Sequence, residues 1–216
     1  MYNPIDLPRN QKVKDNYFVS YSIKNSREIT FFRRIDYEYF LQIELNPMVS
    51  IYCERPCKIQ SNINKEEDII IDFWLRYKDG REEMQSILYS SPVSISEKMR
   101  YINIERYFAN KNIPYILKTK SEIKFGNPYI ENLKYLYALI RRAEHNLCEK
   151  YLQVLKRNFA NESMKLNEIV KENIIPIDIL NSTIAYGIFT GQIKAPIETQ
   201  IFDFKLEVSI SYEKKY

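Results

Sequence analysis

The sequence predicts an α/β fold in which a mixed β-sheet flanked by helices is followed by a mostly helical, winged-helix-like domain. Three observations lead to this prediction. Asp79-Gly80 joins two strand-like runs within residues 69–89, which is a strong signal for a β-hairpin. Helical and strand-like patterns alternate around the hairpin, as in layered α/β proteins. Gly126-Asn127-Pro128 then separates this part from one with helical periodicity.

The chain begins with a polar stretch, residues 1–25, that contains two prolines and scattered basic residues. We expect it to form an extended N-terminal arm. From residue 26 the pattern becomes helical, with Asp36, Phe40 and Ile43 spaced along one face. This helix is expected to end before Pro47, because the residue that precedes a proline avoids the α region.

The predicted hairpin decides which side chains share a face of the sheet. With Asp79-Gly80 as a two-residue tip, Trp74 pairs with Gln85 and Asp72 pairs with Ile87. A lone carboxylate, Asp72, would then enter a largely apolar strand that faces Gln85 and Ile87.

Elements on both sides of the hairpin complete the first domain, which we place at residues 26–128. Residues 49–59 have the pattern of a strand, interrupted by a proline. Residues 96–110 are expected to form a helix and residues 114–119 a further strand.

The remaining residues, 129–216, predict three helices followed by a β-ribbon, which is the pattern of a winged helix. The first helix is expected over residues 132–159 and the third over residues 177–190. Residues 202–210 alternate between apolar and polar side chains, as in a half-buried strand. The third helix contains no lysine or arginine, whereas helices that read DNA grooves carry cations. We therefore favour protein–protein docking slightly over direct DNA reading for this domain.

Composition limits the class of protein. The chain has 216 residues and a formal net charge of +4, which is compatible with nucleic-acid binding without proving it. Its three cysteines lack a second Cys/His pair that would complete a zinc site, so we expect reduced thiols. The sequence shows no signal peptide and no apolar run long enough to span a membrane, and we expect a cytoplasmic protein.

The composition also limits which kinds of catalytic site the chain could contain. The single histidine, His145, lies in a charged helical run, where a solvated side chain is the expected role rather than catalysis. Four glycines form neither a GxGxxG motif nor a P-loop. The sequence therefore leaves carboxylates with a metal ion, or no chemistry at all.

Two interpretations of Asp72 stay open at this point. The first is a charged residue on a solvent-exposed hairpin face. The second is half of a metal-dependent nuclease site, in which a strand aspartate and an acidic residue or glutamine on the partner strand hold a divalent cation. Carboxylate and amide oxygens are suitable ligands for magnesium, and a nearby lysine would orient the attacking water.

The order of several short motifs resembles the TnsA-type endonuclease subunits of heteromeric DNA transposases. These motifs are Glu44-Leu45-Asn46-Pro47, Val49-Ser50-Ile51-Tyr52 with Glu54-Arg55-Pro56, Asp72-Phe73, residues 113–123 and Asn132-Leu133. The resemblance spans roughly residues 26–210. It implies a restriction-endonuclease-like domain that binds Mg²⁺ and cleaves DNA at the 5′ ends of a transposon. It also implies two partners, a DDE transposase subunit (TnsB-like) and an AAA+ ATPase regulator (TnsC-like), which contacts the C-terminal region.

The resemblance also assigns site residues. Asp36 falls where the family has a helix glutamate, eight residues before Glu44. Asp72 matches the strand aspartate, and Gln85 matches the glutamate or glutamine of the second hairpin strand. The family lysine, two residues further on, is replaced by Ile87, and Lys98 on the next helix is the candidate substitute. Without the family pattern, Asp36 could be an ordinary helix surface charge and Gln85 an exposed strand side chain.

Three hypotheses follow from the sequence. In the first, the chain is a Mg²⁺-dependent nuclease subunit that uses Asp36, Asp72 and Gln85. In the second, the replacement of the lysine by Ile87 marks a catalytically inactive assembly or DNA-binding subunit on the same scaffold. In the third, the chain is an unrelated DNA-binding regulator that acts through residues 131–216.

Overall fold

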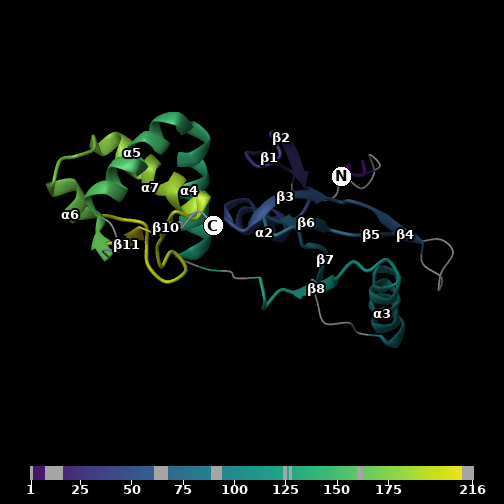
Figure 1. The fold of residues 1–216 in the computed structure, drawn as a ribbon. Helices are drawn as coiled ribbons and strands as arrows, with labels where there is room; N and C mark the ends of the chain where they lie inside the picture. The colour runs from purple at the N-terminus through teal and green to yellow at the C-terminus, as the bar shows by residue number, and fades with distance from the viewer. Residues whose placement is uncertain are drawn as a thin grey trace. The chain divides into compact units, whose positions relative to one another are not determined.

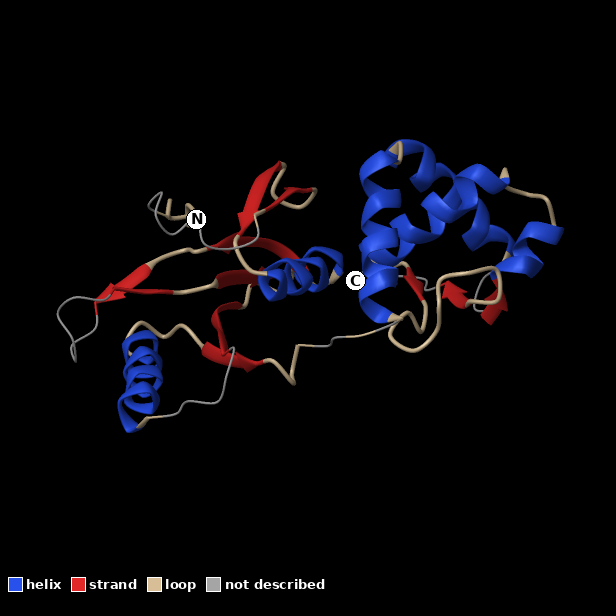
Figure 2. Ribbon diagram, turned by 180° about the vertical axis from the view of Figure 1, so that it is seen from behind, coloured by secondary structure: helices blue, strands red, loops and turns tan. Residues whose placement is uncertain are grey.

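The computed structural model describes residues 2–7, 17–60, 68–88, 94–123, 126, 128–159 and 163–210. The chain is a mixed α/β protein with a mixed sheet and helices, and its C-terminal part is largely helical, as the sequence predicts (Figure 2). It forms two compact units, Met1–Phe40 with Met48–Lys124 and Leu41–Pro47 with Phe125–Tyr216.

A four-stranded sheet is the framework of the first unit (Figure 1). Its strands follow the order β3 (Val49–Glu54), β6 (Phe73–Tyr77), β7 (Glu82–Leu88) and β8 (Tyr115–Thr119). β6 is antiparallel to both of its neighbours, β3 and β7, whereas β7 and β8 are parallel. A parallel pair needs a long crossover connection, and α3 (Ile95–Ala109) lies in that connection.

Two helices pack on opposite faces of this sheet. Tyr39 of α2 (Arg34–Leu45) contacts Phe73 edge to face, with 5.5 Å between ring centroids. Ile104 and Phe108 of α3 instead belong to the apolar cluster around Trp74. Because successive strand residues point to opposite faces, Phe73 and Trp74 assign α2 to one face and α3 to the other.

Two short ribbons extend the first unit. β1 (Phe18–Ser22) pairs with β2 (Arg27–Phe31), and β4 (Lys58–Gln60) pairs with β5 (Asp68–Ile70). The first ribbon differs from our expectation of an arm up to residue 25 and a helix from residue 26. Its inward side chains, among them Ile29 and Phe31, are buried, so packing against the unit decides the strand conformation.

The hairpin between β6 and β7 forms as predicted, but its register differs by one residue. Phe73, not Trp74, lies opposite Gln85. The cause is the turn. Gly80 N–H donates to the Tyr77 carbonyl at 3.0 Å and Gly80 has a φ of 85°, while Tyr77 N–H bonds the Arg81 carbonyl at 2.8 Å. Three residues therefore form the loop, with glycine in the left-handed position, instead of a two-residue tip.

The second unit contains α4 (Tyr129–Arg142), α5 (His145–Asn158), α6 (Leu166–Lys171) and α7 (Ile177–Thr190). Its small antiparallel sheet has the order β10 (Ile193–Lys194), β11 (Glu207–Ile210) and β9 (Ser163–Lys165). Leu180, Ile184 and Ile188 of α7 are buried. A central helix with this burial stabilises the unit through its apolar side chains.

Two predictions for this unit are wrong in detail. The helix expected over residues 132–159 is two helices, because Ala143 and Glu144 adopt extended backbone conformations. The strand expected over residues 202–210 is limited to β11. Before it, Phe202 N–H donates to the side chain of Asn132 at 2.8 Å and Leu206 N–H bonds the Asp203 carbonyl, so these backbone groups are not available for a strand ladder.

Candidate functional site

The acidic site predicted from the sequence lies on the α2 side of the first unit. Asp72 stands between β5 and β6, where the regular alternation of side chains is interrupted. Its main-chain carbonyl accepts the Arg55 N–H at 2.8 Å, and one carboxylate oxygen, Oδ2, accepts the Ile87 N–H at 2.7 Å. The neighbouring β7 strand thus fixes the position of the Asp72 carboxylate through the main chain.

Arg33, which no sequence motif selected, joins Asp72 to Asp36. Its Nε donates to Asp36 Oδ2 at 2.8 Å, and one terminal nitrogen donates to Asp72 Oδ1 at 2.7 Å. Asp36 lies in the first turn of α2 and is buried, whereas the Arg33 side chain is 41% exposed. The two carboxylates predicted as ligands are therefore brought together, with a guanidinium group between them.

Burial dominates the protonation equilibrium of Asp72. It raises the pKa of Asp72 to about 6, because the charged carboxylate loses solvation. The positive charge of Arg33 and the Ile87 N–H oppose this shift, while the negative charge of Asp36 adds to it. The pKa of Asp72 remains above its ordinary value, so one arginine does not fully compensate the burial of this carboxylate.

Gln85 is buried on the same side of the sheet, but its amide group has other partners. Tyr39 of α2 donates its hydroxyl to Gln85 Oε1 at 2.5 Å. Gln85 Nε2 donates to Glu83 Oε1 at 2.5 Å, and the Tyr77 hydroxyl donates to the same oxygen at 2.6 Å. Gln85 is therefore held in a hydrogen-bonded chain that begins on α2, rather than in a bond to either aspartate. Burial raises the pKa of Tyr39, which keeps its hydroxyl protonated as a donor.

Neither Ile87 nor Lys98 adds a side-chain cation to this arrangement. Ile87, which stands at the family lysine position, is 3% exposed and contributes only its main-chain N–H to Asp72. Lys98 is exposed on α3, whose buried residues pack on the face opposite α2. The structure thus gathers Asp36 and Asp72 around Arg33, with Gln85 nearby through Tyr39, and leaves Lys98 on a different helix.

The donor atoms suit a hard divalent cation in kind. Asp36 and Asp72 offer carboxylate oxygens and Gln85 an amide oxygen, which are the ligand types that Mg²⁺ takes in proteins. Within the described ranges, no three His, Cys, Asp or Glu side chains are grouped so that they could hold a metal ion. The position between the two aspartates is filled by the Arg33 guanidinium, a cation supplied by the chain itself.

Sequence reasoning could have found Arg33 only in part. Arg33 and Asp36 are three positions apart, which is a spacing of neighbouring helix side chains, but Arg34 and Glu38 are four apart, which is another such spacing, and they also pair, at 2.6 Å. Nothing in the local pattern separates one arginine from the other. The contact that distinguishes Arg33 is the one to Asp72, which comes from the tertiary fold.

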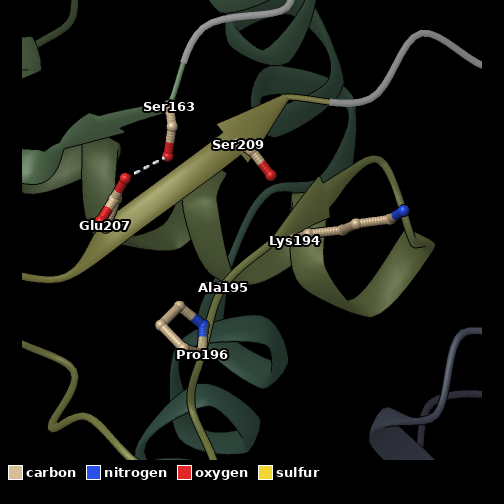
Figure 3. A pocket seen from close by; sticks show the side chains of 6 residues that line it. All are labelled: Ser163, Lys194, Ala195, Pro196, Glu207 and Ser209. Carbon is tan, nitrogen blue, oxygen red and sulfur yellow. Dashed lines mark hydrogen bonds between the residues drawn. The ribbon is translucent and has the colours of Figure 1, made fainter.

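A pocket lies on the small sheet of the second unit (Figure 3). It is lined by Ser163, Lys194, Ala195, Pro196, Glu207 and Ser209. Ser163 Oγ donates to Glu207 Oε1 at 2.6 Å, and Lys194 extends away from that pair (Figure 3). In this pocket the Glu207 carboxylate already accepts a hydrogen bond, and the Lys194 amine points away from it. The polar side chains that line the pocket therefore do not converge on a common ligand position.

No protein-family model matches the chain, and no curated protein matches it. Among the described residues, none of the helices combines the length and apolar character that crossing a membrane would require.

Proposed function

We propose that the protein is a TnsA-like subunit of a DNA-transposition machinery, with a Mg²⁺-dependent nuclease site that cleaves DNA at the 5′ ends of the element. The observation that carries the proposal is the convergence of Asp36 and Asp72 on one cation, from a helix and from the start of a strand. Metal-dependent nucleases need this kind of oxygen-rich site for phosphodiester hydrolysis. The proposed partners are transposon-end DNA, a DDE transposase subunit and an AAA+ ATPase regulator.

The arrangement of the first unit supports a restriction-endonuclease-like fold. Its helix, hairpin, crossover helix and parallel strand occur in the order that the resemblance implies. Asp36 lies on α2, Asp72 directly before β6 and Gln85 on β7. β6 and β7 are neighbouring strands, and α2 packs on one face of their sheet. This combination of topology and residue placement is what the proposal uses.

The second unit supports a winged-helix-like module. From α5 onward its element order is helix, strand, two helices and two strands, and β11 pairs with both β9 and β10. The third helix counted from α5, α7, has no lysine or arginine, and only Ile177 and Asp178 at its start are exposed. A helix of this kind has few exposed groups for phosphates or base edges. We therefore assign the module to docking of the ATPase regulator, with DNA contact as the alternative.

In the proposed reaction, Asp36, Asp72 and Gln85 would hold Mg²⁺, which supplies Lewis-acid activation of the phosphate and of a water molecule when it is bound. The main-chain N–H of Ile87 and the hydroxyl of Tyr39 position Asp72 and Gln85. The isoleucine side chain can neither orient a water molecule nor stabilise negative charge. Cleavage should consequently be weaker than in a site with the family lysine, and any compensating cation has to come from elsewhere.

The test is cleavage of transposon-end DNA by the complex reconstituted with its two partners in Mg²⁺. We expect Asp72→Asn to abolish cleavage at the 5′ ends while the complex still assembles. Asp79→Asn, in the exposed hairpin loop, is the matched control and should leave cleavage unchanged. Equal cleavage by the Asp72→Asn and unmodified complexes would show that the assigned site is wrong.

Two observations favour a second function, that of a non-catalytic assembly subunit on the same scaffold. The family lysine position is an apolar residue, Ile87, and Arg33 already neutralises part of the acidic pair. In this case the reconstituted complex should join DNA without any cleavage that depends on Asp72. Complex formation, measured by co-purification, should then be unaffected by Asp72→Asn.

A further inference from the structure

Arg33 makes the same kind of contact with both candidate metal ligands. Two nitrogens of its single planar guanidinium reach Asp36 Oδ2 at 2.8 Å and Asp72 Oδ1 at 2.7 Å. Charge-assisted bonds of this length are the stronger class of protein hydrogen bonds. The Arg33 guanidinium therefore bridges the two carboxylates at the position where a metal ion that both of them coordinate would bind.

We propose that Arg33 is the resident cation of this site and competes with a divalent ion for Asp36 and Asp72, so that it sets the metal affinity of the chain. The inference rests on the proposed function, because it concerns the same acidic pair. It goes beyond that function by assigning a role to a residue outside the family pattern. Arg33 would thereby determine when the site can hold a metal.

The hydrogen bonds around Asp72 support competition rather than simultaneous binding. Asp72 Oδ1 accepts from Arg33 and Oδ2 accepts from the Ile87 N–H. The oxygen of Gln85 already accepts the Tyr39 hydroxyl. A divalent ion that binds between Asp36 Oδ2 and Asp72 Oδ1 therefore has to displace the Arg33 guanidinium, because that group already occupies the position between these two oxygens.

Charge and exposure make this replacement physically reasonable. The Arg33 side chain is 41% exposed, whereas those of Asp36 and Asp72 are 11% and 17% exposed. The arginine can swing into solvent while the carboxylates stay in place. One guanidinium compensates one of the two negative charges, and a divalent ion compensates both, so the exchange has an electrostatic driving force.

The experiment measures Mn²⁺ binding to the full-length chain from the loss of the electron paramagnetic resonance signal of free Mn²⁺, with Mg²⁺ as competitor. Arg33→Gln should bind Mn²⁺ about tenfold more tightly than the unmodified chain, on the scale of one charge-assisted pair. Arg33→Lys keeps the charge but loses the two-pronged geometry, and we expect an intermediate affinity. Circular dichroism shows whether each variant folds. If Arg33→Gln does not fold, Arg33→Lys still tests the competition, because it retains a cation at the site.

Arg34→Gln is the matched control, since it removes an equal charge from the adjacent position, where the arginine pairs with Glu38. It should leave the Mn²⁺ affinity unchanged. Asp72→Asn combined with Arg33→Gln should remove the gain. These results for the four variants together support competition between Arg33 and the divalent ion.

Two outcomes overturn it and can be told apart. If the unmodified chain and Arg33→Gln bind Mn²⁺ equally, and Asp72→Asn abolishes binding, Arg33 is not a competitor while the proposed metal site stands. If folded Arg33→Gln and the unmodified chain both fail to bind Mn²⁺, the competition and the metal-dependent function fail together.

Discussion

Arg33 and Asp72 are 39 positions apart in the chain, yet their side chains form an ion pair of 2.7 Å. This pair connects the residue just before α2 with the residue just before β6. Because Arg33 also bonds Asp36, the start of the helix and the start of the strand share one charge cluster. The candidate site and the stability of the first unit therefore depend on the same groups.

Protonation of Asp72 should make stability depend on pH. Its pKa is raised from the ordinary 3.8 to about 6 by burial. Between these values the unfolded chain ionises Asp72 while the folded chain keeps it protonated, so the contribution of Asp72 to stability is present below about pH 4 and is lost as the pH rises through 6. The loss should be on the order of 2–3 kcal/mol.

Urea denaturation at a series of pH values measures this effect as the difference between the unmodified chain and Asp72→Asn. The asparagine variant lacks the titrating group, so the difference should change between about pH 4 and pH 7 and then stay constant. A difference that is constant across this range would mean that the pKa of Asp72 is not raised in the folded protein.

Asn132 should be a principal determinant of stability in the second unit. Its buried Nδ2 donates to the carbonyls of Ile197 and Gln200 at 2.7 and 2.6 Å, and its Oδ1 accepts the Phe202 N–H. Asn132→Ala leaves these main-chain groups without their partner and should lower the free energy of unfolding by about 2–4 kcal/mol. Thermal denaturation followed by circular dichroism measures the loss.

Asn158→Ala is the comparison for Asn132→Ala. Asn158 is exposed and makes a single side-chain bond, to the Val154 carbonyl within its own helix. Its replacement should change the free energy of unfolding by less than about 0.5 kcal/mol. Similar effects of the two substitutions would contradict the assignment of Asn132 as the anchor of residues 197–202.

The three-residue turn of the β6–β7 hairpin can be tested at Gly80. Gly80 has a φ of 85°, and a Cβ placed there would meet no atom within 4 Å. Gly80→Ala should therefore cost about 1 kcal/mol through backbone conformation alone. Gly80→Asn should cost less, because asparagine tolerates the left-handed region. Equal stability of Gly80→Ala and the unmodified chain in urea would contradict this turn.

Ile87→Lys tests whether the apolar residue limits catalysis. The substitution places a charge at a position that is 3% exposed and should lower the free energy of unfolding by about 2–4 kcal/mol. If the site is a nuclease that lacks only this cation, cleavage by the reconstituted complex should increase. Ile87→Met, which adds no charge, should leave cleavage unchanged. A folded Ile87→Lys complex without increased cleavage would favour the assembly function.

Local patterns were sufficient to predict most elements of the fold. Asp79-Gly80 located the hairpin, Pro47 lies just beyond the end of α2, and Gly191 follows the end of α7. In each case one residue with a restricted or unusual backbone decides the structure. The strand Phe18–Ser22 and the break at Ala143 carry no such signal, and both were missed.

The family pattern was enough to select candidate residues, but not to predict the hydrogen bonds that these residues make. The family pattern selected Asp36, Asp72 and Gln85, and the side chains of all three lie on the α2 side of the sheet. The register of the hairpin depends on whether its loop has two or three residues. Asp79-Gly80 is compatible with both loop lengths, so the sequence does not decide between them. The role of Arg33 depends on a tertiary contact with Asp72, which no spacing rule reveals.

A crystal structure of the full-length chain, grown with Mn²⁺ and measured at the manganese absorption edge, would show directly whether a divalent ion displaces Arg33. We expect an anomalous peak between the carboxylates of Asp36 and Asp72, with Arg33 moved out of that position. An Arg33 guanidinium that remains bonded to both aspartates, with no manganese beside them at saturating Mn²⁺, would contradict this expectation.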